Sequence, residues 1–198
     1  MPAPRLVLAR HGGTEWTDSG RHTGRTDLDL TEAGRSQARR LGGRLAGLGL
    51  GLVLTSPLRR AAETCRLAGF GDRARPCPEA QEWDYGDYEG LTSERIHELD
   101  PSWRLWRDGC PGGESPQDVG GRADAVLALC SAAPGDALLF SHGHFLRVLA
   151  ARWLGLGPGA GGMLALRPAS LSVLGSEHGA PALWTWDDVA HLGAPLLD

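Results

Sequence analysis

The 198-residue chain is predicted to form an α/β fold, a three-layer α/β/α sandwich with a mostly parallel central sheet. Short apolar runs of strand length alternate with longer segments whose apolar residues recur at helical spacing. Two of the runs, residues 6–9 and 137–140, are apolar throughout, which is typical of strands buried on both faces of a parallel sheet. No internal repeat or low-complexity segment divides the chain, so residues 1–198 are expected to form a single domain.

The helices are predicted from capping residues and from apolar spacing. Thr31 suits an N-cap, and the helix after it is expected to end before the glycines at 49 and 51. Its apolar face comprises Ala38, Leu41, Leu45 and Leu48. Ser115 suits a second N-cap, for a helix that runs to about Cys130. Further helices are expected over residues 58–67 and 145–154, and one or two short helices within 92–107.

The remaining apolar runs predict strands at the middle and the end of the sequence. A short strand is expected over residues 52–54. After the glycine-rich stretch 155–162, alternating segments predict strands near a sheet edge at 163–166, 170–174 and 182–186. The loop 108–114, rich in glycine and proline, is expected to form a mobile rim of the site.

Composition excludes several classes of function. The net charge is −4 and the pI about 6.0, so no global basic field favours nucleic acid. The chain has no lysine, which removes a Walker P-loop and Schiff-base chemistry. No apolar run has the length of a membrane span, and no signal-peptide pattern precedes the first strand. The four cysteines lack CxxC spacing, so free thiols and a cytoplasmic location are expected.

Cationic and imidazole side chains follow two of the predicted strands. Strand 6–9 stops at Arg10-His11, and strand 137–140 is followed by Ser-His-Gly-His at 141–144. Ligands of open α/β sheets bind outside the carboxyl ends of the strands. Arginine holds phosphate in a bidentate fork, and neutral imidazole can attack phosphorus. The two strand ends therefore predict a phosphate-ester site; the alternative is polar residues that merely close strands in solvent.

Two further segments supply a phosphate clamp and a proton donor. Pro57 can occupy the first turn of a helix, which places Arg59 near the positive end of that helix. Segment 82–90 is dense in carboxylates and aromatics, and its residues alone leave the choice of acid open. The candidates are Glu82, Asp84, Asp87 and Glu89. With the two histidines, these groups form the set needed for phosphoryl transfer through a covalent phosphohistidine.

Seven motifs, in order and with compatible spacing, resemble those of the histidine phosphatase superfamily, the phosphoglycerate mutase-like proteins. They are Arg10-His11-Gly12 with Thr14 and Trp16, residues 21–24 followed by 30–34, Ser56-Pro57 with Arg59, 82–90, 112–115 and 141–144. Segments 82–90 and 141–147 are most similar to the small bacterial acid phosphatases and the sugar-bisphosphate phosphatases. Thr17 and His144 stand where the mutases typically carry asparagine, which places a mutase assignment in doubt.

The resemblance implies a role for each site residue and a phosphoglycerate mutase-like fold. His11 is the expected nucleophile, and Arg10, Arg59 and His142 are expected to line the phosphate pocket. Glu82 is the expected general acid and then the base that activates water. Arg60 is expected to be a solvated helix residue. The substrate-binding set is Thr23, Gly24, Tyr85, Gly143, His144 and Arg147, with Arg147 holding a second anionic group.

The chemistry implied by these residues needs neither a cofactor nor a metal. Two arginines and a donating histidine can neutralise the transferring phosphoryl group, and nearby arginines favour the neutral, reactive form of His11. Glu82, shielded by Trp83 and Tyr85 and close to a phosphate dianion, is expected to hold its proton readily, which predicts a bell-shaped pH profile on the acid side of neutrality.

The remaining histidines have less specific interpretations. The His-x-His pair at 142 and 144 is a weak metal-binding pattern, because no further ligand stands at suitable spacing. The other histidines are expected to be surface or capping residues: His22, His97, His178 and His191.

The sequence favours an acid-phosphatase type of phosphomonoesterase that hydrolyses small phosphorylated metabolites. The alternatives are a phosphoglycerate mutase-type isomerase, a phosphatase specific for sugar bisphosphates and a non-catalytic module that binds phosphorylated ligands. Only residues 82–112 separate the expected acid from the Gly-Gly-Glu-Ser segment, whereas mutases usually have a longer insertion there. A homodimer is common among relatives and stays open here.

Overall fold

A six-stranded sheet lies at the centre of the computed structural model, which describes residues 4–193. The strands are β1 (Leu6–Arg10), β2 (Leu50–Thr55), β3 (Arg75–Pro76), β4 (Asp136–Ser141), β5 (Leu171–Glu177) and β6 (Ala180–Asp188). Their order is β3-β2-β4-β1-β5-β6, with β1 to β4 parallel to one another and β5 and β6 antiparallel at one edge. The predicted mostly parallel sheet is confirmed.

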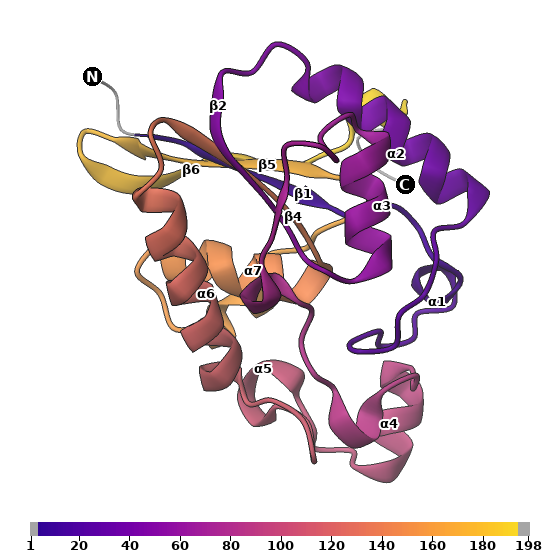
Figure 1. The fold of residues 1–198 in the computed structure, drawn as a ribbon. Helices are drawn as coiled ribbons and strands as arrows, with labels where there is room; N and C mark the ends of the chain where they lie inside the picture. Colours follow the sequence, from indigo (N-terminus) through magenta and orange to yellow (C-terminus); the bar gives the residue numbers. More distant parts are fainter. Residues whose placement is uncertain (1–3, 194–198) are drawn as a thin grey trace.

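Helices cover both faces of this sheet and produce the predicted three layers (Figure 1). One face carries α2 (Glu32–Leu45) and α3 (Arg59–Leu67), and the other carries α6 (Pro116–Ser131) and α7 (Gly143–Trp153). Strand residues alternate between two cores: Val7 and Ala9 pack on the α2–α3 side, whereas Leu6 and Leu8 pack on the α6–α7 side. The short α-helices are α1 (Glu15–Asp18), α4 (Ser93–Leu99) and α5 (Leu105–Asp108). The 3₁₀ segments are η1 (Pro78–Ala80), η2 (Gly86–Tyr88), η3 (Pro158–Met163) and η4 (Ala190–Leu192).

Both predicted helix caps are confirmed. The Thr31 side chain accepts from the Gly34 amide, and the Ser115 side chain accepts from the Asp118 amide. The end of α2 differs from the prediction, because the helix stops at Leu45 and Leu48 is 37% exposed. Gly47 adopts a φ of +80°, which turns the chain out of the helix before Leu48. In the part of the chain that the structure describes, no helix is long and apolar enough to cross a bilayer.

The strand predicted at 163–166 is wrong. Met163 is the last residue of η3, and residues 164–166 continue as irregular backbone that joins no strand ladder. Two of its carbonyls accept hydrogen bonds from side chains: Ala165 O from the Trp186 indole and Leu166 O from the Arg10 guanidinium. The apolar residues of this segment do not share one buried face: Leu166 is buried, whereas Met163 is exposed. The segment thus contacts Arg10 at the end of β1 instead of forming an edge strand.

The parallel pairing of β1 with β4 positions the site. Arg10 lies opposite Ser141 in this register, so the next residues, His11 and His142, emerge side by side at the carboxyl ends of both strands. The His11 amide donates to the Ser141 carbonyl over 3.0 Å, which continues the ladder by one step. Gly12 follows at a close approach to α2, where a Cβ atom would lie 2.4 Å from the Gly34 carbonyl oxygen.

Candidate active site

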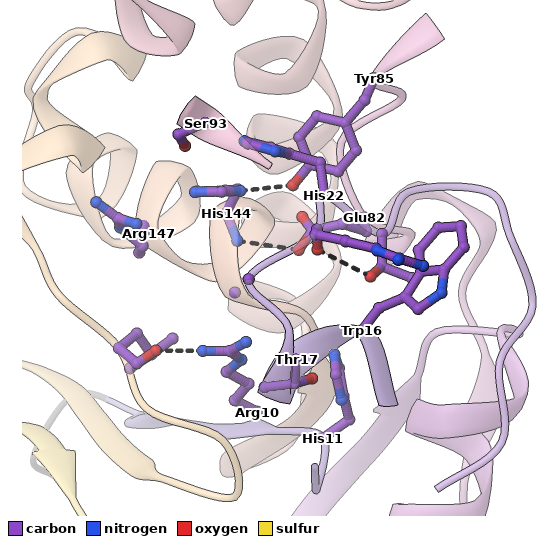
Figure 2. A pocket seen from close by; sticks show the side chains of 15 residues that line it. Arg10, His11, Trp16, Thr17, His22, Glu82, Tyr85, Ser93, His144 and Arg147 are labelled. Atoms are coloured by element: carbon purple, nitrogen blue, oxygen red, sulfur yellow. Dashed lines mark hydrogen bonds between the residues drawn. The ribbon is translucent and has the colours of Figure 1, made fainter. Parts of the chain in front are cut away.

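A pocket of about 250 Å³ opens at the carboxyl ends of β1 and β4 (Figure 2). Most of the side chains on its wall are polar or charged, as a site for an anionic substrate requires. The lining residues are Arg10, His11, Trp16, Thr17, Gly20, Arg21, His22, Thr23, Glu82, Tyr85, Ser93, Gly143, His144, Arg147 and Leu166. Residues from distant parts of the sequence therefore meet in one cavity, as the strand-end argument predicts.

His11 is held in one tautomer with its outer nitrogen free. Its ring Nδ1 lies 2.7 Å from the Gly12 carbonyl oxygen, which can only accept, so Nδ1 carries the proton. The lone pair of the neutral ring is then on Nε2. Burial, the Arg60 charge and the Arg10 charge hold the pKa of His11 well below its usual range. The His11 ring is consequently neutral in mildly acidic solution, with the Nε2 lone pair available.

Arg10 lies on the same wall and supplies positive charge to the pocket. Its Nη1 donates to the Leu166 carbonyl, and among the described residues its buried Nε has no partner. Gly143 lets the guanidinium approach α7, because a Cβ there would lie 3.2 Å from Arg10 Cζ. An unpartnered buried N–H beside the pocket is suited to an anionic ligand.

The structure corrects the choice between the two adjacent arginines of α3. Arg59 is 58% exposed, pairs with Asp27 and Asp29, and does not line the pocket. Arg60 is fully buried, and its Nε donates to His142 Nδ1 over 3.1 Å. The expectation that Arg60 is a solvated residue is therefore wrong, and so is the placement of Arg59 in the pocket.

The physical reason is the phase of α3, which begins at Arg59. Residues of a helix that face the core recur three and four positions apart, and the buried residues of α3 are Arg60, Ala61, Thr64 and Cys65. Arg60 shares this face, and its Nη atoms donate to the carbonyls of Thr23, Gly24 and Thr26. One guanidinium thus ties the loop after α1 to the histidine at the end of β4.

His142 lies behind His11 rather than on the pocket wall. The two ring centroids are 5.2 Å apart, and His142 is fully buried. Its Nδ1 accepts from Arg60, so Nε2 carries the proton and donates to Ser56 Oγ over 2.7 Å. Burial and the Arg60 charge keep the pKa of His142 well below its usual range. His142 is therefore a neutral ring that is hydrogen-bonded to Arg60 and Ser56 and lies against the His11 ring.

Glu82 is the only one of the four candidate carboxylates that lines the pocket. Its Oε1 accepts from the amides of Trp83 (2.9 Å) and Phe145 (2.8 Å), and its Oε2 accepts from the His144 amide (3.1 Å). The last two amides belong to the first turn of α7, where free N–H groups favour an acceptor. The side chain is fixed in place while it faces the cavity of Arg10 and His11 (Figure 2).

Two of the other three carboxylates of segment 82–90 have hydrogen-bond or ion-pair partners elsewhere. Asp84 pairs with Arg25, and Glu89 accepts from the amides of Gly24 and Thr26. Asp87 lies beside Gly112, on the outside of the pocket. Of the four carboxylates that the sequence left open as candidates for the acid, Glu82 alone therefore faces the pocket.

Of the predicted substrate-binding residues, Gly24 alone lies outside the pocket wall, while the other five line it. Gly24 is required by close packing, because a Cβ there would lie 2.5 Å from the Trp83 carbonyl oxygen. Arg147 lines the pocket, stacks over Trp106 at 4.4 Å and donates to the carbonyls of Gly161 and Gly162. Tyr85 reaches His144, to which its hydroxyl is hydrogen-bonded.

Sequence reasoning missed His22 as a site residue. The prediction of a surface position is wrong, since His22 is 9% exposed and lines the pocket. It lies in a loop with no periodic pattern, so only its place between Arg21 and Thr23 pointed to the site. Five residues that were not expected there also line the pocket: Trp16, Thr17, Gly20, Ser93 and Leu166. Arg21, from the motif at 21–24, lines it as well.

The lowered pKa of His11 predicts the position of the acid limb of the pH profile. Only the neutral ring can attack phosphorus, so a lower pKa extends activity to lower pH. We expect kcat/KM to hold as pH falls through the ordinary histidine value of 6.5 and to decline only well below it. Initial rates from about pH 4 to about pH 8 will measure this limb. A limb centred at the ordinary histidine value would contradict the assignment of His11 to this buried, cationic environment.

Comparison with known proteins places this site in a family. The sequence profile of the histidine phosphatase superfamily (branch 1) matches residues 6–189. An acid phosphatase of Mycobacterium tuberculosis is 44% identical over 183 residues, which cover 90% of this chain and 90% of that protein. The chain is thus an enzyme of the histidine phosphatase superfamily, to which it belongs by sequence over nearly its whole length.

Other relatives have different names within the same family. A sedoheptulose 1,7-bisphosphatase of Saccharomyces cerevisiae is 37% identical over 191 residues, covering 79% of this chain and 70% of that protein. A probable phosphoglycerate mutase of Salmonella paratyphi B is 33% identical over 215 residues, covering 98% and 97%. The solved structure of a Mycobacterium tuberculosis open reading frame is 42% identical and superimposes with a TM-score of 0.88, covering 93% of this chain and 97% of that one.

Proposed function

We propose that this protein is a phosphomonoesterase that hydrolyses small phosphorylated metabolites through a phosphohistidine on His11. The proposal rests on the state of the His11 ring. Its proton is fixed on Nδ1, so the lone pair on Nε2 is free. The pKa of His11 is also lowered, which keeps the ring neutral. A neutral nucleophile beside the Arg10 guanidinium is suited to attack a phosphate dianion.

The residues support a two-step reaction. In the first step Nε2 of His11 forms a bond to phosphorus, the ester P–O bond breaks, and Glu82 gives its proton to the leaving alkoxide. In the second step Glu82 takes a proton from water, whose oxygen attacks phosphorus and breaks the P–N bond. Inorganic phosphate leaves, and both residues return to their starting states.

Positive charge for the transferring group comes from arginine. Arg10 lines the pocket, and Arg60 is close enough to lower the pKa values of both His11 and His142. Preoriented cations of this kind stabilise charge that develops on the equatorial oxygens. The proposed chemistry uses no metal, and we expect phosphate release to be unaffected by a chelator.

Hydrolysis is favoured over transfer of the phosphoryl group to another hydroxyl oxygen of the substrate. The acid phosphatase relative is 44% identical, against 33% for the relative named a probable mutase. The short segment between Glu82 and Gly112 also leaves out the insertion expected of mutases. A preference for sugar bisphosphates is the second candidate, because Arg21 and Arg147 both line the pocket and could hold another anion.

A panel assay tests the proposal. Phosphate release is measured at mildly acidic pH from an aryl phosphate, sugar mono- and bisphosphates, nucleotides and 3-phosphoglycerate, with and without chelator. We expect release that the chelator does not change. Conversion of 3-phosphoglycerate to its isomer without release would instead identify a mutase.

A cytoplasmic location also belongs to the proposal. The four cysteines are buried and unpaired, which suits a reducing compartment. Burial raises the pKa of the Cys65 thiol to about 12, so this thiol is unreactive.

A further inference from the structure

Two histidine rings form a stacked pair on the wall of the pocket. His22 comes from the loop after α1, and His144 comes from the first turn of α7. Their ring centroids are 6.0 Å apart and their planes differ by only 16°. Both rings line the cavity together with His11 and Glu82, and Figure 2 shows them on the side of the pocket away from His11. The pair therefore lies where the leaving group of a substrate attacked by His11 would extend.

The tautomer of His22 is fixed by the backbone. Its Nδ1 lies 2.9 Å from the Leu91 carbonyl oxygen, which can only accept a proton. In the neutral ring Nδ1 therefore carries the hydrogen, and Nε2 is an acceptor.

The tautomer of His144 is the opposite one. Its Nδ1 is hydrogen-bonded to the Tyr85 hydroxyl. Burial raises the pKa of Tyr85 well above its usual range, so the phenol keeps its proton. The phenol is a stronger acid than a neutral imidazole N–H, so its O–H donates to Nδ1 and Nε2 of His144 carries the ring hydrogen. Burial and the Arg147 charge hold the pKa of His144 well below its usual range, so this ring stays neutral.

When the His22 ring is neutral, the pocket wall thus presents one acceptor and one donor. Among residues 4–193, neither Nε2 atom has a hydrogen-bond partner. A hydroxyl group both donates and accepts, so a single hydroxyl, or two neighbouring ones, can satisfy the pair. A second phosphate in its dianionic form can only accept, and it would face the lone pair of His22 Nε2.

We propose that His22 and His144 form a hydroxyl-binding pair that selects phosphate esters of polyhydroxylated alcohols over esters of apolar alcohols. This inference rests on the proposed phosphatase function, since it names the substrate class of the same pocket. An apolar leaving group would leave both Nε2 atoms without a partner in a partly buried site, which costs binding free energy. The pair binds the leaving group and takes no part in phosphoryl transfer.

Two substrates of equal charge and carbon number test the pair. Glycerol 3-phosphate carries two hydroxyls that propyl phosphate lacks. We expect the wild-type enzyme to prefer glycerol 3-phosphate by about tenfold in kcat/KM, the effect of one or two well-placed hydrogen bonds. In His22→Asn, the amide nitrogen can replace the Nδ1 donor to Leu91 while Nε2 is lost. In His144→Asn, the amide oxygen can accept from Tyr85 while the Nε2–H is lost. Each change should reduce the preference to about twofold.

His97→Asn is the matched control, because His97 lies outside the pocket. Its ring contacts Trp103 at 5.8 Å, the same centroid distance as that of His22. This variant should keep the wild-type preference. A wild-type preference near one, or an unchanged preference in both pocket variants, would overturn the hydroxyl-binding pair.

A binding measurement separates this inference from the proposed reaction. Dissociation constants of both esters are measured by calorimetry with His11→Asn protein, which needs no turnover. Tighter binding of glycerol 3-phosphate supports the pair even if no ester is hydrolysed by the wild type, an outcome that would overturn the phosphatase proposal alone. Equal dissociation constants would overturn the pair while active hydrolysis left the phosphatase proposal standing.

Discussion

Replacing His11 with asparagine is expected to lower kcat for phosphate release by about 10⁴-fold or more, the scale seen when a covalent nucleophile is removed. Asparagine keeps a donor toward the Gly12 carbonyl but has no atom at the place of Nε2. The pocket cations would still bind the phosphate ester, so KM should change much less than kcat. Initial rates on an aryl phosphate give both parameters.

His178→Asn is the control for this substitution. His178 is exposed in the turn between β5 and β6 and has a φ of +50°, a conformation that asparagine tolerates. The activity of the His178→Asn variant should equal that of the wild type. Thermal unfolding of both variants checks that the fold is retained. Residual activity of His11→Asn within tenfold of the wild type would contradict the role of His11 as nucleophile.

The two neighbouring arginines of α3 are expected to differ sharply. Arg60→Ala should lower kcat by about 10²-fold, because a buried cation that acts on the phosphoryl site is lost. It should also lower the free energy of unfolding by about 2 to 3 kcal/mol, since His142 Nδ1 and three backbone carbonyls lose a donor. Arg59→Ala removes exposed ion pairs with Asp27 and Asp29, so kcat should stay within about twofold.

Arg60→Lys separates charge from geometry. Lysine keeps the positive charge but cannot donate at once to His142 and to the loop carbonyls as the guanidinium fork does. We expect partial recovery of kcat with little recovery of stability. If Arg59→Ala lost as much activity as Arg60→Ala, the assignment of Arg60 as the cation that acts on the phosphoryl group would be contradicted.

The layers, the sheet and the main helices were predictable because they follow from the spacing of apolar residues along the chain and from the residues that cap the helices. The strand ends at Arg10 and Ser141 also located the pocket, since parallel neighbours end at one sheet edge. Helix phase was harder to predict. Pro57 suggested where α3 begins, but only the buried positions Ala61 and Thr64 show that Arg60 faces inward.

Features that depend on contacts between residues distant in the chain could not be predicted from the sequence. His22 lies in an aperiodic loop, and its ring is buried by Tyr85 and Trp103, which follow more than sixty residues later. Residues 163–166 have the alternation of a strand, yet their carbonyls accept from Arg10 and Trp186 instead of joining the ladder. The helix α1 is only four residues long, held by the capping box of Thr14 and Thr17, and is too short for a periodic signal.

The most direct test of the phosphohistidine claim is a mass measurement on enzyme quenched during turnover under non-acidic conditions, which preserve the labile P–N bond. The account predicts one added phosphoryl group on the peptide that contains His11, chased away by water on further incubation and absent from His11→Asn. A phosphoryl group on another residue, or full turnover with no phosphorylated enzyme at any time, would contradict it.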